Sequence, residues 1–145
     1  LWHFNVLTRC PDVSDHFNMV VDAQNMRLDS GSVRAIYGQG CFHHFPDPSI
    51  FFRELSRVLA PGGGAILIDP FYGPVSSLVH TYLLSEGFDK HASGWTTKTE
   101  GAMYGANQAL SFVVFVRDRK LFSENFEQLE LIHQKQLMNG LRYFL

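Results

Sequence analysis

Two adjacent histidines and one aspartate are the side chains of this sequence best suited to acid–base chemistry. His43 and His44 stand side by side, and Asp69 follows the apolar run that ends at Ile68. An imidazole titrates near neutral pH, so either histidine is a candidate general base; the alternative is that both pack and hydrogen-bond at a helix entrance. Asp69 could orient a substrate or act as a base, or it could be a turn residue before Pro70. Adjacent side chains chelate one ion poorly, so we expect no metal site.

Other residues are suited to meeting a ligand at the end of a strand. Gly38 and Gly40 follow the apolar run 33–37, and small residues there let the backbone approach a ligand closely. Asp22 ends the shorter run 19–21, where its carboxylate could bind a ligand or act as a helix cap or turn residue. Strands that end in polar or glycine residues are typical of an α/β sheet, in which ligands gather at that edge.

Three consecutive glycines, Gly62 to Gly64, raise the question of a phosphate-binding loop. Such a loop follows a strand and opens a helix, so that backbone N–H groups face the anion. Here the glycines follow a helical pattern and lead into the apolar run Ala65–Ile68, with no Lys-Ser/Thr after them. We therefore expect them to stop the helix and form a tight turn, at the end of the sheet away from any ligand.

The elements that must position these residues follow from periodicity and turn signals. Asp47-Pro48 suits a helix start, and the apolar residues that follow form one stripe, so the pattern predicts a helix over 48–59. A buried strand at Ala65–Ile68 comes next, and the order strand, helix, strand predicts parallel strands joined by a right-handed crossover. The other predictions are strands at Phe4–Leu7, Met19–Val21, Val33–Tyr37 and Leu129–Ile132, a strand or buried helix at Ala109–Val116, and a helix at Asp118–Phe126.

Composition bounds the class of protein. The 145 residues, 46% of them hydrophobic, suit one globular domain with a sizeable core. The net charge of -2 without a basic block argues against nucleic-acid binding. The two cysteines are far apart, so we expect neither a disulfide scaffold nor a cysteine zinc site. No apolar run approaches the roughly 18 residues of a membrane span. With no signal-peptide pattern, we expect a cytoplasmic protein; the apolar ends and the missing initiator Met predict a piece of a longer chain.

Several segments resemble one enzyme family. The stretch ELSRVLAPGG, from Glu54 to Gly63, resembles the E-x-x-R-V-L-x-P-G-G segment of class I S-adenosylmethionine-dependent methyltransferases. Upstream, VVDAQNMRLDSGSVRAIYGQGCFHHFPDP resembles the adenine-binding and following segments of that family. The matches cover Val20 to Pro70 in the family's order and spacing. Beyond Pro70, FYGP, EGFDK and ANQALSFVVFVRDR resemble a bacterial branch.

The resemblance implies an α/β fold with the Rossmann-like sheet of class I methyltransferases, here incomplete at both ends. The family's D/E-x-G-x-G strand should lie before Leu1, and a final antiparallel strand should follow Leu145. Residues 1–145 would then form a single partial domain, with 71–104 as a variable substrate-side or lid insertion. A missing first strand would leave sheet surface uncovered, so a homo-oligomer is a reasonable hypothesis.

The resemblance also implies a cofactor, S-adenosylmethionine, and residues that bind it. The Asp22 carboxylate would accept a hydrogen bond from the adenine amino group, and the N–H of Ala23 would meet the ring. Gln24 would flank the same ring, and Gln39 and Gly40 would lie beside the methionine end. The alternatives are a cap or turn residue at Asp22, a surface turn residue at Gln24 and a plain strand end at Gly40.

The implied reaction is direct displacement of the cofactor's methyl group by an unidentified small molecule or saccharide-type acceptor. His43, His44 or Asp69 would act as base only where the nucleophile must lose a proton. The alternative is a non-catalytic or truncated methyltransferase-like domain with a structural or interaction role. A nicotinamide dehydrogenase is a poorer interpretation, because the chain contains no GxGxxG.

Overall fold

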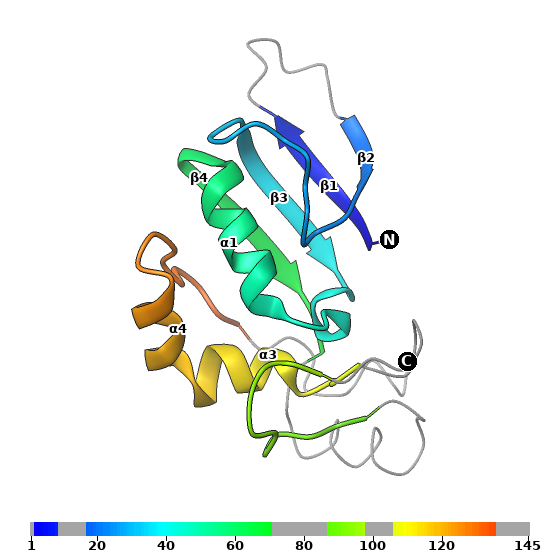
Figure 1. The fold of residues 1–145 in the computed structure, drawn as a ribbon, viewed down its shortest axis with the longest axis vertical. Coiled ribbons are helices and arrows are strands. Elements are labelled where there is room, and N and C mark those ends of the chain that lie inside the picture. Colours follow the sequence, from blue (N-terminus) through cyan, green and yellow to red (C-terminus); the bar gives the residue numbers. More distant parts are fainter. Residues whose placement is uncertain (1, 9–16, 71–86, 98–105, 136–145) are drawn as a thin grey trace. The chain divides into compact units, whose positions relative to one another are not determined.

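The structure, a computed structural model, describes residues 2–8, 17–70, 87–97 and 106–135 (Figure 1). Residues 71–86 and 98–105 of the predicted insertion lie outside these ranges. The chain divides into two compact units: Leu1–Phe42 with Asp47–Asp69, and His43–Pro46 with Pro70–Leu145. No helix in the described ranges is long and apolar enough to cross a membrane.

The first unit contains a sheet whose strands lie in the order β2-β1-β3-β4. The strands are β1 (Trp2–Thr8), β2 (Phe17–Val21), β3 (Val33–Gln39) and β4 (Leu59–Ile68). β3 and β4 pair in parallel, as the strand–helix–strand order predicts, and Figure 1 shows their arrows running the same way. The chain therefore has the α/β character expected from the sequence.

β1 departs from a parallel sheet, because it is antiparallel to both of its neighbours. The connection from Thr8 to Phe17 is shorter than the roughly dozen residues that a parallel crossover needs. β1 and β2 can therefore be neighbours only as antiparallel strands. Since β1 opposes both β2 and β3, those two strands run in the same direction, and β4 runs with them.

Helix α1 (Pro48–Val58) connects β3 to β4 and begins as the sequence predicts. The Asp47 carboxylate accepts a hydrogen bond from the N–H of Ser49 at 2.9 Å, and Pro48 occupies the first turn. The helix ends at Val58, one residue before the predicted end, because Leu59 adopts an extended conformation while its N–H still bonds to Leu55.

Aromatic side chains fill the core under α1. Phe51 and Phe52 are buried on the helix, and Phe42 packs on both, with ring centroids 6.3 and 5.7 Å away. Val33 and Ile36 of β3 are buried as well. Burying such side chains is the main favourable contribution to folding, so the position of α1 on the sheet follows from its apolar stripe.

The three glycines lie inside β4, so the predicted tight turn was wrong, whereas the helix does end before them, at Val58. Pairing with β3 jumps from Val33↔Leu59 to Ala35↔Gly64, so the residues between bulge out of the ladder. Gly62 has φ +71°, and a Cβ on Gly63 would lie 2.9–3.0 Å from three backbone carbonyl oxygens. The bulge thus needs glycine at Gly62 for its backbone conformation and at Gly63 for space.

The apolar half of β4 is less buried than its sequence predicts. Ile66 is 65% exposed and Ile68 is 40% exposed, whereas Ala65 and Leu67 are half-buried. β4 is an outer strand of the sheet, and successive side chains of a strand point to opposite faces. The expectation of a buried strand at Ala65–Ile68 was therefore wrong: one face is exposed and the other is only half-buried.

The second unit is helical where the sequence left strand or helix open. α3 (Leu110–Phe112) continues into a π-helical turn, η2 (Val113–Arg117), and α4 (Arg119–Asn125) follows. The predicted pair Phe122 and Phe126 is in contact, with ring centroids 5.7 Å apart. The predicted strand at Leu129–Ile132 was wrong: this segment has no regular structure and Ile132 is 87% exposed.

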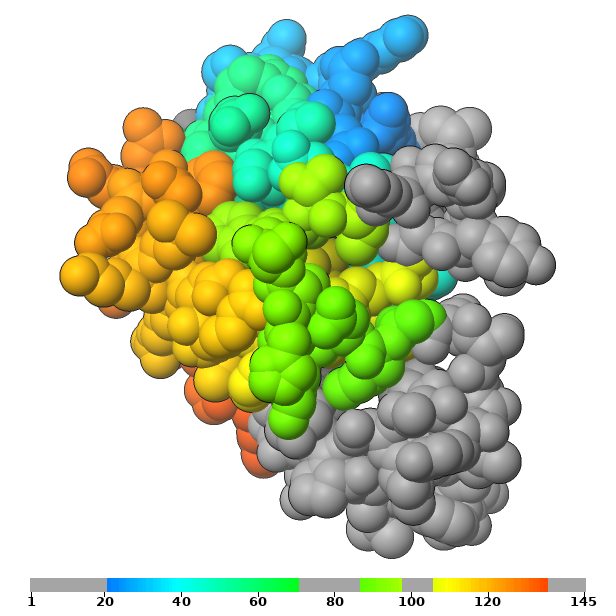
Figure 2. All heavy atoms as spheres, turned by 60° about the horizontal axis from the view of Figure 1, so that its bottom comes forward, coloured from blue at the N-terminus to red at the C-terminus, as the bar shows by residue number. Residues whose placement is uncertain are grey.

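An arginine–aspartate pair joins the helical residues of the second unit to the segment 87–97. Figure 2 shows this segment in bright green beside the yellow residues that follow 106. Arg117 makes two hydrogen bonds to Asp118, at 2.8 and 2.7 Å, and it also bonds to the carbonyl oxygens of Lys90 and Ala92. Trp95 donates its indole N–H to the same carboxylate at 2.9 Å. The guanidinium and the indole hold the pKa of Asp118 below its usual range, against the opposing effect of burial.

Substitution within the bulge should separate the two glycine requirements. Gly63→Ala should lower the free energy of unfolding by about 1–3 kcal/mol, because its methyl group would overlap backbone atoms that cannot move away. Gly64→Ala is the matched control: no atom lies within 4 Å of the place its methyl group would take, so stability should stay within about 0.5 kcal/mol of wild type. Urea unfolding of both variants measures the difference; equal stabilities would contradict the close approach at Gly63.

Candidate functional site

The carboxyl ends of β2, β3 and β4 meet at one edge of the sheet. Gln39 at the end of β3 pairs with Ile68 at the end of β4, and Val21 at the end of β2 pairs with Trp2 at the start of β1. Five predicted residues lie in or directly after these strand ends: Asp22, Ala23, Gln39, Gly40 and Asp69. Loops at this edge are where ligands bind in open α/β sheets.

Asp22 forms a tight turn after β2. Its Oδ1 accepts a hydrogen bond from the N–H of Gln24 at 3.0 Å, and its carbonyl oxygen accepts one from the N–H of Asn25 at 2.9 Å. The turn geometry foreseen as one alternative is thus present. The side chain is exposed, and a carboxylate has acceptor capacity for further hydrogen bonds, so the turn leaves room for a ligand donor.

Gln24 ties this turn to the start of α1. Its Nε2 donates to the carbonyl oxygen of Asp47 at 2.8 Å, while Ala23 beside it is completely buried. The amide group of Gln24 therefore has a structural task, and its Oε1 is the atom that could face a ligand. Asn25 is exposed.

Gly40 and Asp69 organise the ends of β3 and β4. Gly40 has φ +60° and donates its N–H to the carbonyl oxygen of Ile68 at 2.8 Å. Asp69 Oδ1 accepts from the N–H of Phe42 at 3.1 Å, which fixes the start of the short helix η1 (Phe42–His44). Gln39 is exposed, and its Oε1 accepts from the hydroxyl of Tyr37 at 2.8 Å.

Cys41, which follows Gly40 in the sequence, has an unreactive thiol. Burial raises the pKa of its thiol to about 12, and the negative charge of Asp69 acts in the same direction. A thiol with such a pKa is protonated at neutral pH, and only the thiolate is a good nucleophile. Cys41 therefore serves as a buried apolar residue of this edge.

His43 and His44 belong to the second unit. The centroids of their rings lie 4.0 Å apart, and the ring planes meet at 39°. His43 is only 4% exposed, and its carbonyl oxygen accepts a hydrogen bond from the N–H of Asn107 at 3.0 Å. The packed alternative foreseen for the pair agrees with this geometry. The role of general base stays a prediction. The described residues contain no cluster of three or more His, Cys, Asp or Glu that could hold a metal ion.

Sequence reasoning missed an ion pair on α1, between Glu54 and Arg57. Arg57 donates two hydrogen bonds to Glu54, both at 2.8 Å, and a third to the carbonyl oxygen of Leu28 at 2.6 Å. Glu54 Oε2 also accepts from the N–H of Met26 at 2.9 Å. The signal was the spacing of E-x-x-R on a helix, which places both side chains on one face.

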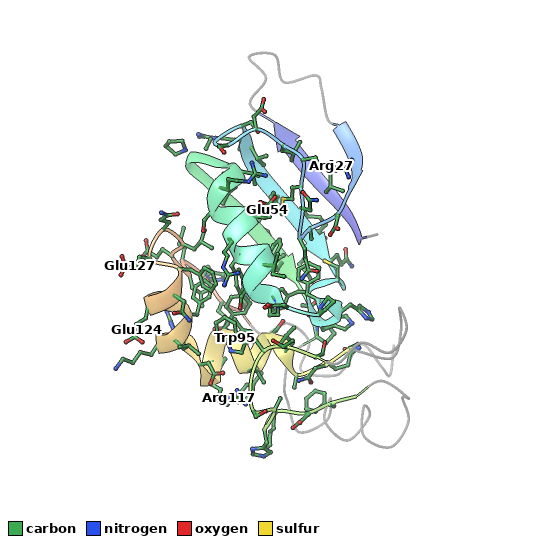
Figure 3. The ribbon with its side chains drawn as sticks, in the orientation of Figure 1. Arg27, Glu54, Trp95, Arg117, Glu124 and Glu127 are labelled. Carbon is green, nitrogen blue, oxygen red and sulfur yellow. The ribbon has the colours of Figure 1, made fainter. Side chains whose placement is uncertain are left out.

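The pair has an electrostatic consequence. Hydrogen bonds from Arg57 hold the pKa of Glu54 below its usual range, more strongly than burial raises it, and the N–H of Met26 acts in the same direction as Arg57. Figure 3 labels Glu54 on α1 and Arg27 on the loop whose backbone the pair holds. The charged form of Glu54 is therefore part of the folded structure of this loop.

Comparisons with known proteins agree with the resemblance. Residues 5–67 match the family model described as "Methyltransferase domain". Over 58 residues the chain is 41% identical to a sarcosine/dimethylglycine N-methyltransferase of Halorhodospira halochloris, a match that covers 39% of this chain and 21% of the relative. No solved structure matches the chain. For residues 5–67 these matches support the class I S-adenosylmethionine-dependent methyltransferase family that the sequence resembles.

The lowered pKa of Glu54 predicts how stability depends on pH. Because the pKa is lower in the folded chain, the stabilisation is complete above the usual glutamate pKa of about 4.3 and is lost as the pH falls through the folded-state pKa. Glu54→Gln should therefore destabilise the chain at about pH 7 by about 1 kcal/mol, and this difference from wild type should shrink towards pH 3, roughly one unit below the usual pKa.

Urea unfolding at several pH values measures this difference. Glu124→Gln is the control, because Glu124 lies in an exposed pair with Lys120 at 3.6 Å that should contribute little at any pH. A difference between wild type and Glu54→Gln that stays constant with pH would count against the proposed contribution of the charged carboxylate.

Proposed function

We propose that this chain contributes the cofactor-binding edge of an S-adenosylmethionine-dependent methyltransferase that acts on a small molecule. The observation that carries the proposal is the gathering of three strand ends at one edge, within the segment that matches the methyltransferase family. The matched segment spans 21% of the length of one curated relative, so the activity of a whole methyltransferase is itself part of the proposal.

The residues at this edge fit the adenosine end of the cofactor. The Asp22 carboxylate is exposed and can accept a hydrogen bond beyond the one from Gln24. The turn that follows carries the half-buried Gln24, whereas Ala23 is completely buried in the folded chain. We assign the adenine amino group to Asp22 and one flank of the ring to Gln24, while the contact that the resemblance implies for the N–H of Ala23 stays a prediction.

Two residues at the end of β3 are candidates for the methionine end of the cofactor. Gly40 has a positive φ, no atom lies within 4 Å of the place where its Cβ would stand, and Gln39 precedes it on the exposed end of β3. We assign these two residues to the methionine end. The sequence contains no D/E-x-G-x-G, the motif with which the family usually wraps this part of the cofactor.

When bound, S-adenosylmethionine supplies an activated methyl group on a sulfonium. The residues of the chain have to align the acceptor and, where the acceptor carries a proton, remove it. Asp69 holds η1 through the N–H of Phe42, and η1 carries His43 and His44. We propose that the carboxylate or one of the imidazoles takes the acceptor's proton.

The acceptor itself is a proposal at the level of chemical class. We propose a small molecule bound by the variable stretch 71–104. The name of the curated relative makes sarcosine and dimethylglycine the first compounds to test. Transfer of a labelled methyl group to either, by the whole protein, would identify an amine acceptor; transfer to a saccharide alone would place the acceptor in the other class considered from the sequence.

One observation favours a second function, a non-catalytic domain with a structural role. Asp22, Gln39 and Asp69 each already accept a hydrogen bond from within the chain. A domain that only needs to keep its shape would use these side chains in the same way. Cofactor binding separates the two functions, because a structural domain has no need to bind S-adenosylmethionine.

Calorimetric titration with S-adenosylmethionine tests the proposal. The folded chain should release or absorb heat on binding, and Asp22→Ala should weaken the affinity about tenfold, as expected when a charged acceptor is removed from a ligand donor. Asp29→Ala is the matched control, because Asp29 is an exposed aspartate of the same loop.

If the folded chain gives no heat of binding at millimolar cofactor, the enzymatic interpretation of this chain is contradicted and the structural one is favoured. An unchanged affinity in Asp22→Ala would remove the assignment of adenine to Asp22 while leaving cofactor binding in place.

A further inference from the structure

The turn that carries Asp22 is attached to α1 on both sides. On one side, Gln24 donates to the carbonyl oxygen of Asp47 at the first turn of the helix. On the other, the N–H of Met26 donates to Glu54, about two helical turns further along. Two attachments to one rigid element leave the turn little freedom to slide or rotate.

The second attachment depends on a planar fork. Arg57 uses Nε and one terminal nitrogen for Glu54 and the other terminal nitrogen for the carbonyl oxygen of Leu28. Glu54 Oε2 is shared between that guanidinium and the N–H of Met26. The geometry of Glu54 is therefore set by Arg57, and the backbone on both sides of Arg27 is set by the pair.

The backbone between these points is strained at Arg27, as expected where anchors on both sides constrain it. Arg27 has φ +25°, a conformation that residues with a Cβ seldom adopt. Such a conformation persists only where the surroundings hold it. Here Met26 is 1% exposed on one side, and the carbonyl oxygen of Leu28 is bound to Arg57 on the other.

We propose that Glu54 and Arg57 are positioning residues for the cofactor: they hold the Asp22–Gln24 turn where its carboxylate can meet the adenine. The inference rests on the proposed function for its ligand, but the effect on the turn is independent of any ligand. A turn held in its binding conformation before the ligand arrives avoids the cost of ordering it on binding. Loss of the pair should thus weaken binding even though neither side chain touches the ligand.

Conservative variants test the fork without removing the helix face. Arg57→Lys keeps the positive charge but has no planar fork, and Glu54→Gln keeps the shape but sets an NH₂ group against Met26 or Arg57. Both should weaken S-adenosylmethionine binding about tenfold, the size of one lost charge-assisted hydrogen bond. Arg53→Lys is the matched control on the same helix, since Arg53 is exposed, and its affinity should equal that of wild type.

A second measurement follows the turn without a ligand. In Arg57→Lys, the amide NMR signals of Gln24 and Met26 should shift and their hydrogen exchange should quicken about tenfold, whereas the amides of Ile36 and Leu55 should keep their protection. A purely structural role would speed exchange throughout the sheet and helix. Exchange that quickens equally at all four amides, or at none, would overturn the inference.

The two measurements keep the two ideas apart. If wild type binds and Arg57→Lys binds equally well, the positioning inference fails and the proposed function stands. If wild type does not bind, the proposed function fails, and the amides decide whether the pair positions the turn. Weaker binding together with exchange that quickens only at Gln24 and Met26 supports both.

Discussion

The parallel pairing of β3 and β4 is the constraint on which the rest of the first unit depends. Two parallel neighbours need a crossover, and α1 is that crossover. The crossover brings the starts of both strands to one edge and their ends to the other. The two edges thus serve different purposes. The glycines in the first half of β4 let its backbone approach the backbone of β3. The polar residues after the ends of β3 and β4 can meet a ligand.

Three aspartates, which follow strands or precede a helix, fix the backbone at the edge of the sheet where a ligand could bind. Asp22, Asp47 and Asp69 each accept a hydrogen bond from a backbone N–H within a few residues or across the sheet edge. A carboxylate that holds a turn keeps further acceptor capacity. The same groups can therefore define the backbone and bind a ligand, which is why a turn role and a cofactor role do not exclude each other at Asp22.

Much of the first unit could be predicted, and the errors have physical causes. The bounds of α1 follow from Asp47-Pro48 and an apolar stripe, both local signals. The apolar run Ala65–Ile68 did predict a strand, but the exposure of Ile66 depends on which strand ends the sheet. Leu129–Ile132 has the composition of a strand, yet a strand forms only where a partner lies alongside. Composition carries no information about that partner.

The sequence by itself determined the helix, the parallel pair and the similarity of residues 5–67 to a methyltransferase domain, because each rests on signals within a short stretch. Only the tertiary structure decided that β1 runs antiparallel and that Glu54 and Arg57 hold the loop at Met26 and Leu28. Each of those two contacts joins residues that are far apart in the sequence, 28 positions for Met26 and Glu54 and 29 positions for Leu28 and Arg57. Local periodicity cannot encode them, since they form only when the packing of α1 on the sheet brings the two segments together.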